Sequence, residues 1–152
     1  MNVAVPKIDF LRQAEVVGRL KARLPESSVL FQTEDTRPYE CDGLSAYRQL
    51  PMVVALPATA EEVQFVLRTC HALKVPVIAR GAGTGLSGGA PPCAEGVLLA
   101  TAKLMRILAV DPVARSARVQ PGVRNLAITD AAAPYGLYYA PDPSSQIACT
   151  IG

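Results

Sequence analysis

A run of closely spaced glycines is the feature of this sequence that could do chemistry. The segment Arg80-Gly-Ala-Gly-Thr-Gly-Leu-Ser-Gly-Gly-Ala90 follows directly after an apolar, strand-like run, Val75 to Ala79. Glycine admits positive φ and lets the backbone approach a ligand closely, and successive N–H groups can converge into an anion-binding concavity. The spacing therefore predicts a loop that binds a phosphate-bearing ligand. A flexible glycine-rich surface connection is the alternative interpretation.

Two well-known phosphate-binding loops do not fit the residues around these glycines. Gly83-Thr-Gly85-Leu-Ser-Gly88 matches G-x-G-x-x-G. The Rossmann form of that motif must open a helix, and it has an acidic residue about 20 positions further on. Here Pro91 and Pro92 disfavour a helix, and Lys103 lies near the position of the acid.

A Walker A loop would end in Gly-Lys followed by Ser or Thr, whereas this loop ends in Gly88-Gly89-Ala90. The pattern that remains is a strand, a glycine loop and a second strand. We therefore expect the loop backbone, rather than a helix end, to contact the ligand, and this argues against a nicotinamide-dependent Rossmann enzyme.

The composition is that of one apolar domain. The chain has 152 residues, of which 50% are hydrophobic and 18% are charged, and its net charge is +2. A domain normally has about 25% charged residues, so the low share suits a piece that packs against more protein. Because there are no basic runs and only 5% of residues are aromatic, we do not expect binding to nucleic acid.

Cysteine and histidine provide no pattern for a metal site. No C-x-x-C pair is present, which favours reduced thiols over disulfides or zinc. We expect His71, the only histidine, to lie on a helix surface. The amino end lacks a secretory signal and no apolar run has the length of a membrane span, so we expect a cytoplasmic protein without a transmembrane segment. The four cysteines are Cys41, Cys70, Cys93 and Cys149.

Periodicity and turn residues predict the elements that position the glycine loop. We expect an amphipathic helix over residues 9–24 and mainly loop over 27–47. Met52 to Leu56 reads as a strand, and Thr59 with Glu62 forms a capping box for a helix over 60–74. With Val75 to Ala79 as the next strand, this gives a β-α-β unit whose exit is the glycine loop.

Further elements are expected beyond the loop. Val97 to Thr101 reads as a strand, and Ile107 to Val110 with Ala117 to Gln120 as a hairpin. An alanine-rich helix over residues 124–134 should end at Gly136.

Several motifs in this order resemble the FAD-binding domain of the vanillyl-alcohol oxidase and p-cresol methylhydroxylase superfamily. They are the glycine loop, Val119-Gln-Pro-Gly-Val123 and Ala140-Pro-Asp-Pro-Ser-Ser-Gln-Ile-Ala-Cys-Thr-Ile-Gly152. The run Arg37-Pro-Tyr-Glu-Cys-Asp-Gly-Leu-Ser-Ala-Tyr47 is similar to the branch of bacterial glycolate oxidase D subunits.

The resemblance implies an α/β fold, the amino-terminal part of a p-cresol methylhydroxylase-type FAD-binding domain, with a small mixed sheet and flanking helices. Residues 51–152 would form this domain, incomplete at its carboxyl end. Residues 1–50 would form an amino-terminal helix and loop extension.

The same resemblance implies which residues contact FAD. The diphosphate would lie on Gly81, Ala82, Gly83, Thr84 and Gly85, with Arg80 and Leu86 at its edges. Pro141, Asp142 and Ser145 would approach the flavin ring or ribityl chain, and Cys149 to Gly152 would run toward the diphosphate and adenine. Members that bind flavin covalently through this loop carry histidine where Thr84 stands here, so the resemblance implies non-covalent FAD.

For the intact protein, the resemblance implies a flavin-dependent 2-hydroxy-acid dehydrogenase of glycolate or D-lactate type, which passes a hydride from the substrate α-carbon to FAD. Other glycolate oxidase subunits are candidate partners, and through them the protein could be peripheral to the inner face of the membrane. No residue matches a catalytic base. We therefore expect an amino-terminal fragment that is inactive alone. A non-catalytic FAD- or nucleotide-binding or assembly module of such a complex is the alternative.

Overall fold

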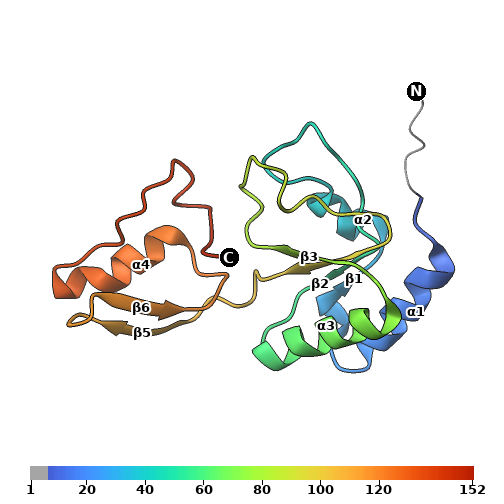
Figure 1. Cartoon of the computed structure of the whole chain (residues 1–152), viewed down its shortest axis with the longest axis horizontal. Helices are drawn as coiled ribbons and strands as arrows, with labels where there is room; N and C mark the ends of the chain where they lie inside the picture. The colour runs from blue at the N-terminus through green and yellow to red at the C-terminus, as the bar shows by residue number, and fades with distance from the viewer. Residues whose placement is uncertain (1–6) are drawn as a thin grey trace.

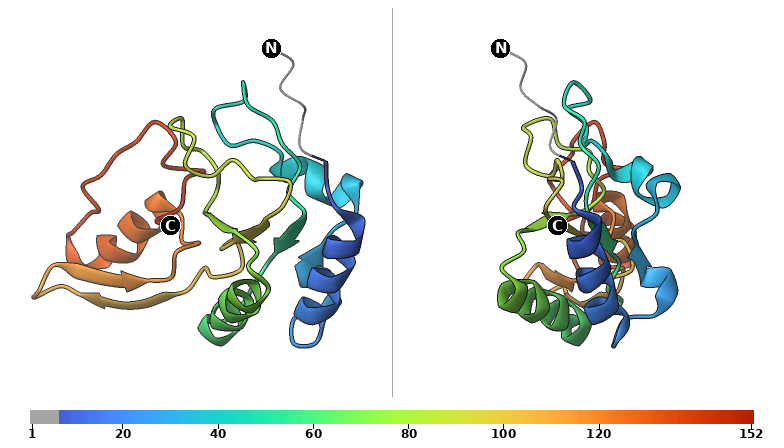
Figure 2. Two further views of the ribbon diagram at one scale, coloured as in Figure 1. Left: turned by 45° about the vertical axis from the view of Figure 1, so that its right-hand side comes forward. Right: turned by 90° about the vertical axis from the view of Figure 1, so that its right-hand side faces the viewer.

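The structure, a computed structural model, describes residues 7–152 and has two parts (Figure 1). One part is a four-stranded sheet with two longer helices, and the other is a hairpin with a single helix. The chain passes from the first part to the second after β4 (Val97–Ala100). After the last helix it returns, so that the carboxyl terminus lies between the two parts (Figures 1 and 2).

The sheet is mixed, with strand order β1-β2-β4-β3. β2 (Val53–Ala55) and β3 (Val77–Arg80) both pair with β4 in parallel, and β1 (Val29–Leu30) pairs antiparallel with β2. Every residue of β2 and β4 is buried, which is typical of central strands covered on both faces. The predicted mixed α/β class with a small mixed sheet is confirmed.

Helices α1 (Phe10–Lys21) and α3 (Ala60–Leu73) lie side by side on one side of this sheet (Figure 2). Both begin at a side-chain cap. Asp9 Oδ1 accepts from the N–H groups of Leu11 and Arg12 in α1, and Thr59 Oγ1, the predicted cap of α3, accepts from Glu62 N at 3.2 Å. Lys74, in the left-handed conformation, ends α3. The core between helices and sheet includes Val16, Leu20, Val53, Val66, Cys70 and Val97.

The second part begins with the antiparallel hairpin of β5 (Ile107–Asp111) and β6 (Ser116–Val119). In its turn, Asp111 Oδ1 accepts from the backbone N–H groups of Val113 and Ala114. α4 (Asn125–Ala132) follows, extended by the short 3-10 helix η3 (Ala133–Tyr135). The predicted hairpin is confirmed, as are the helix and its end at Gly136, which has φ +69°.

The expectation of mainly loop over residues 27–47 is wrong in part. This region contains the 3-10 helices η1 (Glu26–Ser28) and η2 (Arg37–Tyr39), the short helix α2 (Thr33–Thr36), and β1. β1 is too short to show periodicity, and its pairing with β2 is a long-range contact that local sequence patterns do not show.

The structure also locates the histidine. His71 lies exposed on α3, as predicted. Within residues 7–152, no helix is long and apolar enough to cross a membrane. The same residues contain no cluster of three or more His, Cys, Asp or Glu side chains able to hold a metal ion.

Candidate functional site

The glycine loop leaves the carboxyl end of β3 and returns to the start of β4 without any helix or strand between Gly81 and Gly96. The predicted order of strand, glycine loop and strand is therefore confirmed. In sheets of parallel strands, ligands bind outside the carboxyl ends of the strands, because the loops there are free to diverge from the sheet. The loop occupies that edge.

Glycine is required at several positions of the loop. Gly83 and Gly88 have φ +72° and +70°, a region that side chains disfavour. At Gly81 the reason is close packing, since a Cβ there would overlap the carbonyl oxygen of Gly152 and the hydroxyl of Thr150. The start of the loop is thus pressed against the carboxyl-terminal segment.

A cavity of about 340 Å³ lies over the loop. Most of its lining is backbone or small side chains, and Asp42 is its only ionisable side chain among the described residues. The loop and the carboxyl-terminal segment both contribute, which brings together residues from the two structural parts. The lining residues are Asp42, Ala79, Gly81, Ala82, Gly83, Thr84, Gly85, Ser87, Gly89, Ala90, Thr150 and Gly152.

The backbone N–H groups of the loop are available to a ligand. Ala82 N donates to Thr150 Oγ1 at 2.9 Å, and Ala90 N donates to Asp42 Oδ2 at 3.4 Å. Between these two anchored residues, no N–H group from Gly83 to Gly89 donates a hydrogen bond within the described residues. Such a row of free donors suits an anion with several acceptor oxygens.

A buried cation lies against the same loop. Arg80 is 9% exposed, and its Nη1 donates to the carbonyl oxygen of Cys41 at 2.6 Å. Its guanidinium carbon lies 5.7 Å from the centroid of the Tyr39 ring, within the range of a cation–π contact. A Cβ on Gly83 would overlap this guanidinium, so the positive charge lies directly behind the loop backbone. Free N–H donors in front of a fixed cation fit the diphosphate of FAD.

The carboxyl-terminal segment is held beside the loop by backbone pairing. Ile151 N donates to Val123 O at 3.1 Å, and Gly152 N donates to Pro121 O at 2.8 Å. Asn125 extends this contact, since its N donates to Cys149 O at 3.1 Å and its Nδ2 to Pro141 O at 3.2 Å. The predicted motif around Pro121 therefore positions Gly152 at the cavity.

Not all residues implied by the resemblance line the cavity. Gly81, Ala82, Gly83, Thr84, Gly85 and Gly152 do. Arg80 lies behind the loop, and Leu86 is 72% exposed. The other four predicted residues belong to the segment after α4 and lie outside the lining. Pro141 and Asp142 are exposed, and Ser145 and Cys149 are half-buried.

Six lining residues are not named individually among the FAD contacts that the resemblance implies: Asp42, Ala79, Ser87, Gly89, Ala90 and Thr150. Thr150 lies two residues before Gly152 and accepts from the loop, so its position within the same motif could have indicated it. Asp42 is 6% exposed and lies far from the loop in the sequence. It belongs to the run Arg37 to Tyr47, which identified a branch of the family but gave no spatial information.

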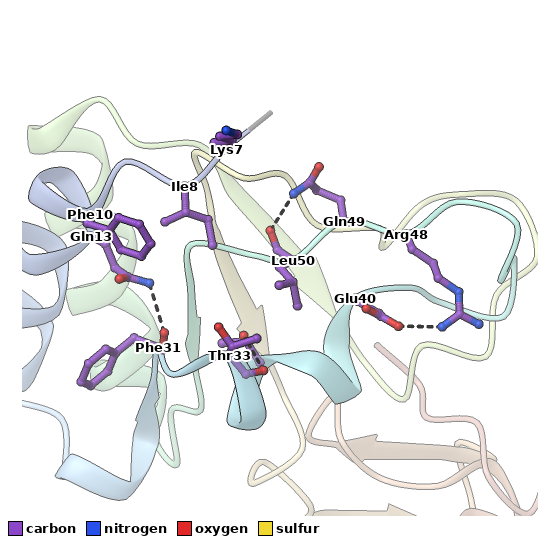
Figure 3. A pocket seen from close by; sticks show the side chains of 11 residues that line it. Lys7, Ile8, Phe10, Gln13, Phe31, Thr33, Glu40, Arg48, Gln49 and Leu50 are labelled. Carbon is purple, nitrogen blue, oxygen red and sulfur yellow. Dashed lines mark hydrogen bonds and ion pairs between the residues drawn. The ribbon is translucent and has the colours of Figure 1, made fainter. Parts of the chain in front are cut away.

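A larger cavity, of about 470 Å³, lies elsewhere, near the start of α1 (Figure 3). Its wall is largely apolar, with Ile8, Phe10, Phe31 and Leu50. Arg48 and Glu40 form an ion pair there, with 2.6 Å between Arg48 Nη1 and Glu40 Oε1. It contains no glycine backbone, so the smaller cavity over the loop remains the candidate site.

Two of the thiols are unsuited to act as nucleophiles. Burial raises the pKa of the Cys70 thiol to about 11, and it also raises the pKa of Cys93. A thiol with a raised pKa carries little thiolate at neutral pH. Neither side chain lines the cavity over the glycine loop.

Comparison with known proteins shows which families share these features. Residues 51–152 match the FAD binding domain family. The chain is 56% identical over 152 residues to the glycolate oxidase subunit GlcD of Escherichia coli (strain K12), a match that covers 100% of this chain and 30% of the relative. It is 42% identical over 100 residues to the D-lactate dehydrogenase of Archaeoglobus fulgidus, covering 66% of this chain and 22% of the relative.

Among solved structures, p-cresol methylhydroxylase with substrate bound is similar, with a TM-score of 0.74 and 24% identity. The superposition covers 88% of this chain and 27% of that one. At this identity the likeness shows a shared fold.

The chain spans about 30% of the length of its E. coli relative.

Proposed function

This chain belongs to the FAD binding domain family, and from that membership we propose that it is the FAD-holding part of a flavin-dependent 2-hydroxy-acid dehydrogenase. The observation that carries the proposal is the row of free N–H groups from Gly83 to Gly89, set over a cavity and backed by the buried guanidinium of Arg80. When bound, FAD supplies the redox chemistry by taking up a hydride from the α-carbon of the acid.

The residues of this chain would act by binding and orientation. The N–H groups of the loop are already directed by the backbone, so little reorganisation is needed when the diphosphate binds. Arg80 would add a positive charge at the edge of the diphosphate, since its guanidinium lies against Gly83, which lines the cavity. Thr84 offers no ring nitrogen for a covalent link, so the proposal keeps FAD non-covalent and dissociable.

The proposed FAD contacts are those implied by the resemblance, with Thr150 added. The loop residues and Gly152 would contact the diphosphate. The segment after α4 would approach the flavin ring, the ribityl chain or the adenine side. The residues are Arg80, Gly81, Ala82, Gly83, Thr84, Gly85, Leu86, Pro141, Asp142, Ser145, Cys149, Thr150 and Gly152.

The substrate and partners are proposed from the relatives. One relative is called a glycolate oxidase subunit and another a D-lactate dehydrogenase, and both names indicate small 2-hydroxy acids. The word subunit supports other glycolate oxidase subunits as partners. We keep residues 51–152 as the FAD-binding domain and residues 1–50 as its extension. The proposed location is the cytoplasm, either free or peripheral to the inner face of the membrane within a complex.

One observation favours the alternative of a non-catalytic FAD-binding or assembly module for this chain by itself. Among the described residues, the cavity lining holds one ionisable side chain, Asp42, and that carboxylate already accepts from two backbone N–H groups. No side chain there is free to act as a substrate base. The two candidates differ in whether turnover requires residues outside this chain.

Uptake of FAD by the purified chain tests the proposal. We expect flavin absorption bands to remain with the protein after gel filtration, and to be lost in Gly83→Val and Gly85→Val. The second variant is the more informative, because a Cβ at Gly85 meets no protein atom within 4 Å, whereas a Cβ at Gly83 would overlap the Arg80 guanidinium. Gly18→Val, on the exposed surface of α1, is the matched control. A well-folded chain that never takes up added FAD would overturn the proposal.

A further inference from the structure

We propose that the segment Cys41–Gly43, outside the matched residues 51–152, holds the glycine loop in its anion-binding conformation before FAD arrives. This proposal rests on the proposed function, because the anion is taken to be the diphosphate of FAD. The segment lies between η2 and β2, and none of the predicted FAD contacts belongs to it. Asp42 and Gly43 are therefore proposed as positioning residues.

Gly43 packs against the outer side of the loop. A Cβ built on Gly43 would lie 2.7 Å from the carbonyl oxygen of Thr84 and 2.8 Å from that of Gly85. Both distances are shorter than protein structures allow, and both involve backbone atoms that cannot rotate away. Only glycine permits this contact, and the two loop carbonyl groups therefore face Gly43.

This contact determines where the loop N–H groups point. In a trans peptide, the N–H of one residue is directed opposite to the C=O of the residue before it. The described residues contain no cis peptide bond. Because the carbonyl groups of Thr84 and Gly85 face Gly43, the N–H groups of Gly85 and Leu86 face the other side. Gly85 lines the cavity and Gly43 does not, so this other side is the one open to an anion.

Hydrogen bonds join the segment to both ends of the loop. At the start, Cys41 O accepts from Arg80 Nη1 at 2.6 Å. At the end, Asp42 Oδ2 accepts from Ala90 N at 3.4 Å, while Asp42 Oδ1 accepts from Leu44 N at 2.9 Å. The glycine-rich stretch between these anchors would otherwise lose much conformational entropy on binding. Fixing it in advance removes that cost from the affinity for FAD.

The charge of Asp42 makes the inference testable. A carboxylate in the lining repels an anion, so on charge alone its removal should tighten binding of FAD. If Asp42 instead holds the loop in place, its removal should weaken FAD binding. In Asp42→Asn, the amide NH₂ group would face one of the two N–H donors, and a bond to the loop or to Leu44 would be lost.

The test compares Asp42→Asn and Gly43→Ala with the wild-type chain and with Gly18→Ala, whose new methyl group meets no atom within 4 Å. FAD affinity is measured by quenching of flavin fluorescence. We expect roughly 5-fold weaker binding for Asp42→Asn and at least about 10-fold for Gly43→Ala, the effect of losing one or two positioned hydrogen bonds. Gly18→Ala should match the wild type within about 2-fold.

A second readout needs no FAD. Chymotrypsin can cleave after the exposed Leu86 in the FAD-free chain, as it can after exposed tyrosines such as Tyr47 and Tyr138. The cleavage rate is therefore taken from the fragments cut between Leu86 and Ser87, identified by mass spectrometry, and it reports how often the loop adopts open conformations. We expect several-fold faster cleavage in Asp42→Asn with an unchanged circular dichroism spectrum. Equal or tighter FAD binding by Asp42→Asn, together with an unchanged cleavage rate, would overturn the inference. Failure of the wild type to bind FAD would instead count against the proposed function, because the cleavage rates are measured without it.

Discussion

The backbone of Gly81 lies directly against the carbonyl group of Gly152, so that a Cβ on Gly81 would overlap that oxygen. The contact joins the end of β3, in the sheet, to the segment that follows α4. Thr150 strengthens it, because its hydroxyl accepts from Ala82 N at 2.9 Å and donates to Gly152 O at 3.0 Å. The candidate FAD site is therefore shared by the two parts of the structure.

Replacing Gly81 should break the contact between the end of β3 and the carboxyl-terminal segment at the candidate site. In Gly81→Ala, either the loop or the segment Thr150–Gly152 must move, because the overlapping atoms belong to the backbone. We expect FAD affinity to fall by at least about 10-fold, which corresponds to about 1.4 kcal/mol. A fluorescence titration with FAD measures this, with Gly18→Ala as the control. An unchanged affinity would show that the contact is irrelevant to binding.

The hydroxyl of Thr150 can be tested by a matched pair of variants. Thr150→Val keeps the shape of the side chain but removes both of its hydrogen bonds, whereas Thr150→Ser keeps the hydroxyl. We expect Thr150→Val to weaken FAD binding by about 1 kcal/mol and Thr150→Ser to stay close to the wild type. Hydrogen exchange at the Ala82 amide should be faster in Thr150→Val alone. Similar behaviour of the two variants would indicate that packing, not the hydroxyl, matters.

Because Thr84 stands where a covalent link would require histidine, we expect denaturation of the protein to release the flavin. After FAD has been loaded and trichloroacetic acid added, all of the flavin should remain in the supernatant, because the loop residue that could be tethered is a threonine. The absorbance of supernatant and dissolved pellet measures the partition. Yellow protein in the pellet would reveal a covalent link and contradict the non-covalent assignment.

We expect the FAD-loaded chain to show no turnover of glycolate or D-lactate with an artificial electron acceptor. The reason lies in the cavity lining, where backbone and small side chains leave no free base. Dye reduction followed in a spectrophotometer is the measurement, with the FAD-free chain as the blank. Measurable reduction of the dye that depends on added glycolate or D-lactate would mean that residues outside the cavity supply the base.

Cys70 should make stability depend on pH in alkaline solution. Its folded-state pKa is raised from 9.0 to about 11 by burial, so the folded chain holds the thiol proton more tightly than the unfolded chain. The associated stability is complete below about pH 9 and is lost as the pH rises toward 11. Its size is roughly 3 kcal/mol, since the shift is about two pKa units and each unit corresponds to about 1.4 kcal/mol.

Urea unfolding of the wild type and of Cys70→Ala at pH 8, 9, 10 and 11 measures this dependence. Other groups titrate in the same range, so the quantity that matters is the difference between the two proteins. We expect the alanine variant to be less stable at pH 8, because it leaves a cavity in the core, and its deficit should shrink by pH 11. If the difference in unfolding free energy between the two proteins stayed constant from pH 8 to 11, the alkaline loss of stability would not come from Cys70.

Local sequence patterns were sufficient for the strands, helices and turns whose determinants lie within a few residues. Thr59 caps α3, Asp111 shapes the hairpin turn, and Gly136 ends the last helix, all through contacts with near neighbours in the sequence. The glycine loop is of the same kind, because its composition itself permits the backbone conformation. These features could be predicted, and the structure confirms them.

Tertiary structure decided what the glycine loop faces and what supports it. β1 exists because β2 lies beside it, and Asp42 and Gly43 reach the loop although about 40 positions of sequence separate them from it. The sequence by itself determined that a glycine loop follows a strand and suits a phosphate-bearing ligand. Only the fold determined that Arg80 lies behind that loop and Gly152 beside it, because long-range packing places side chains and carbonyl groups where no local pattern records them.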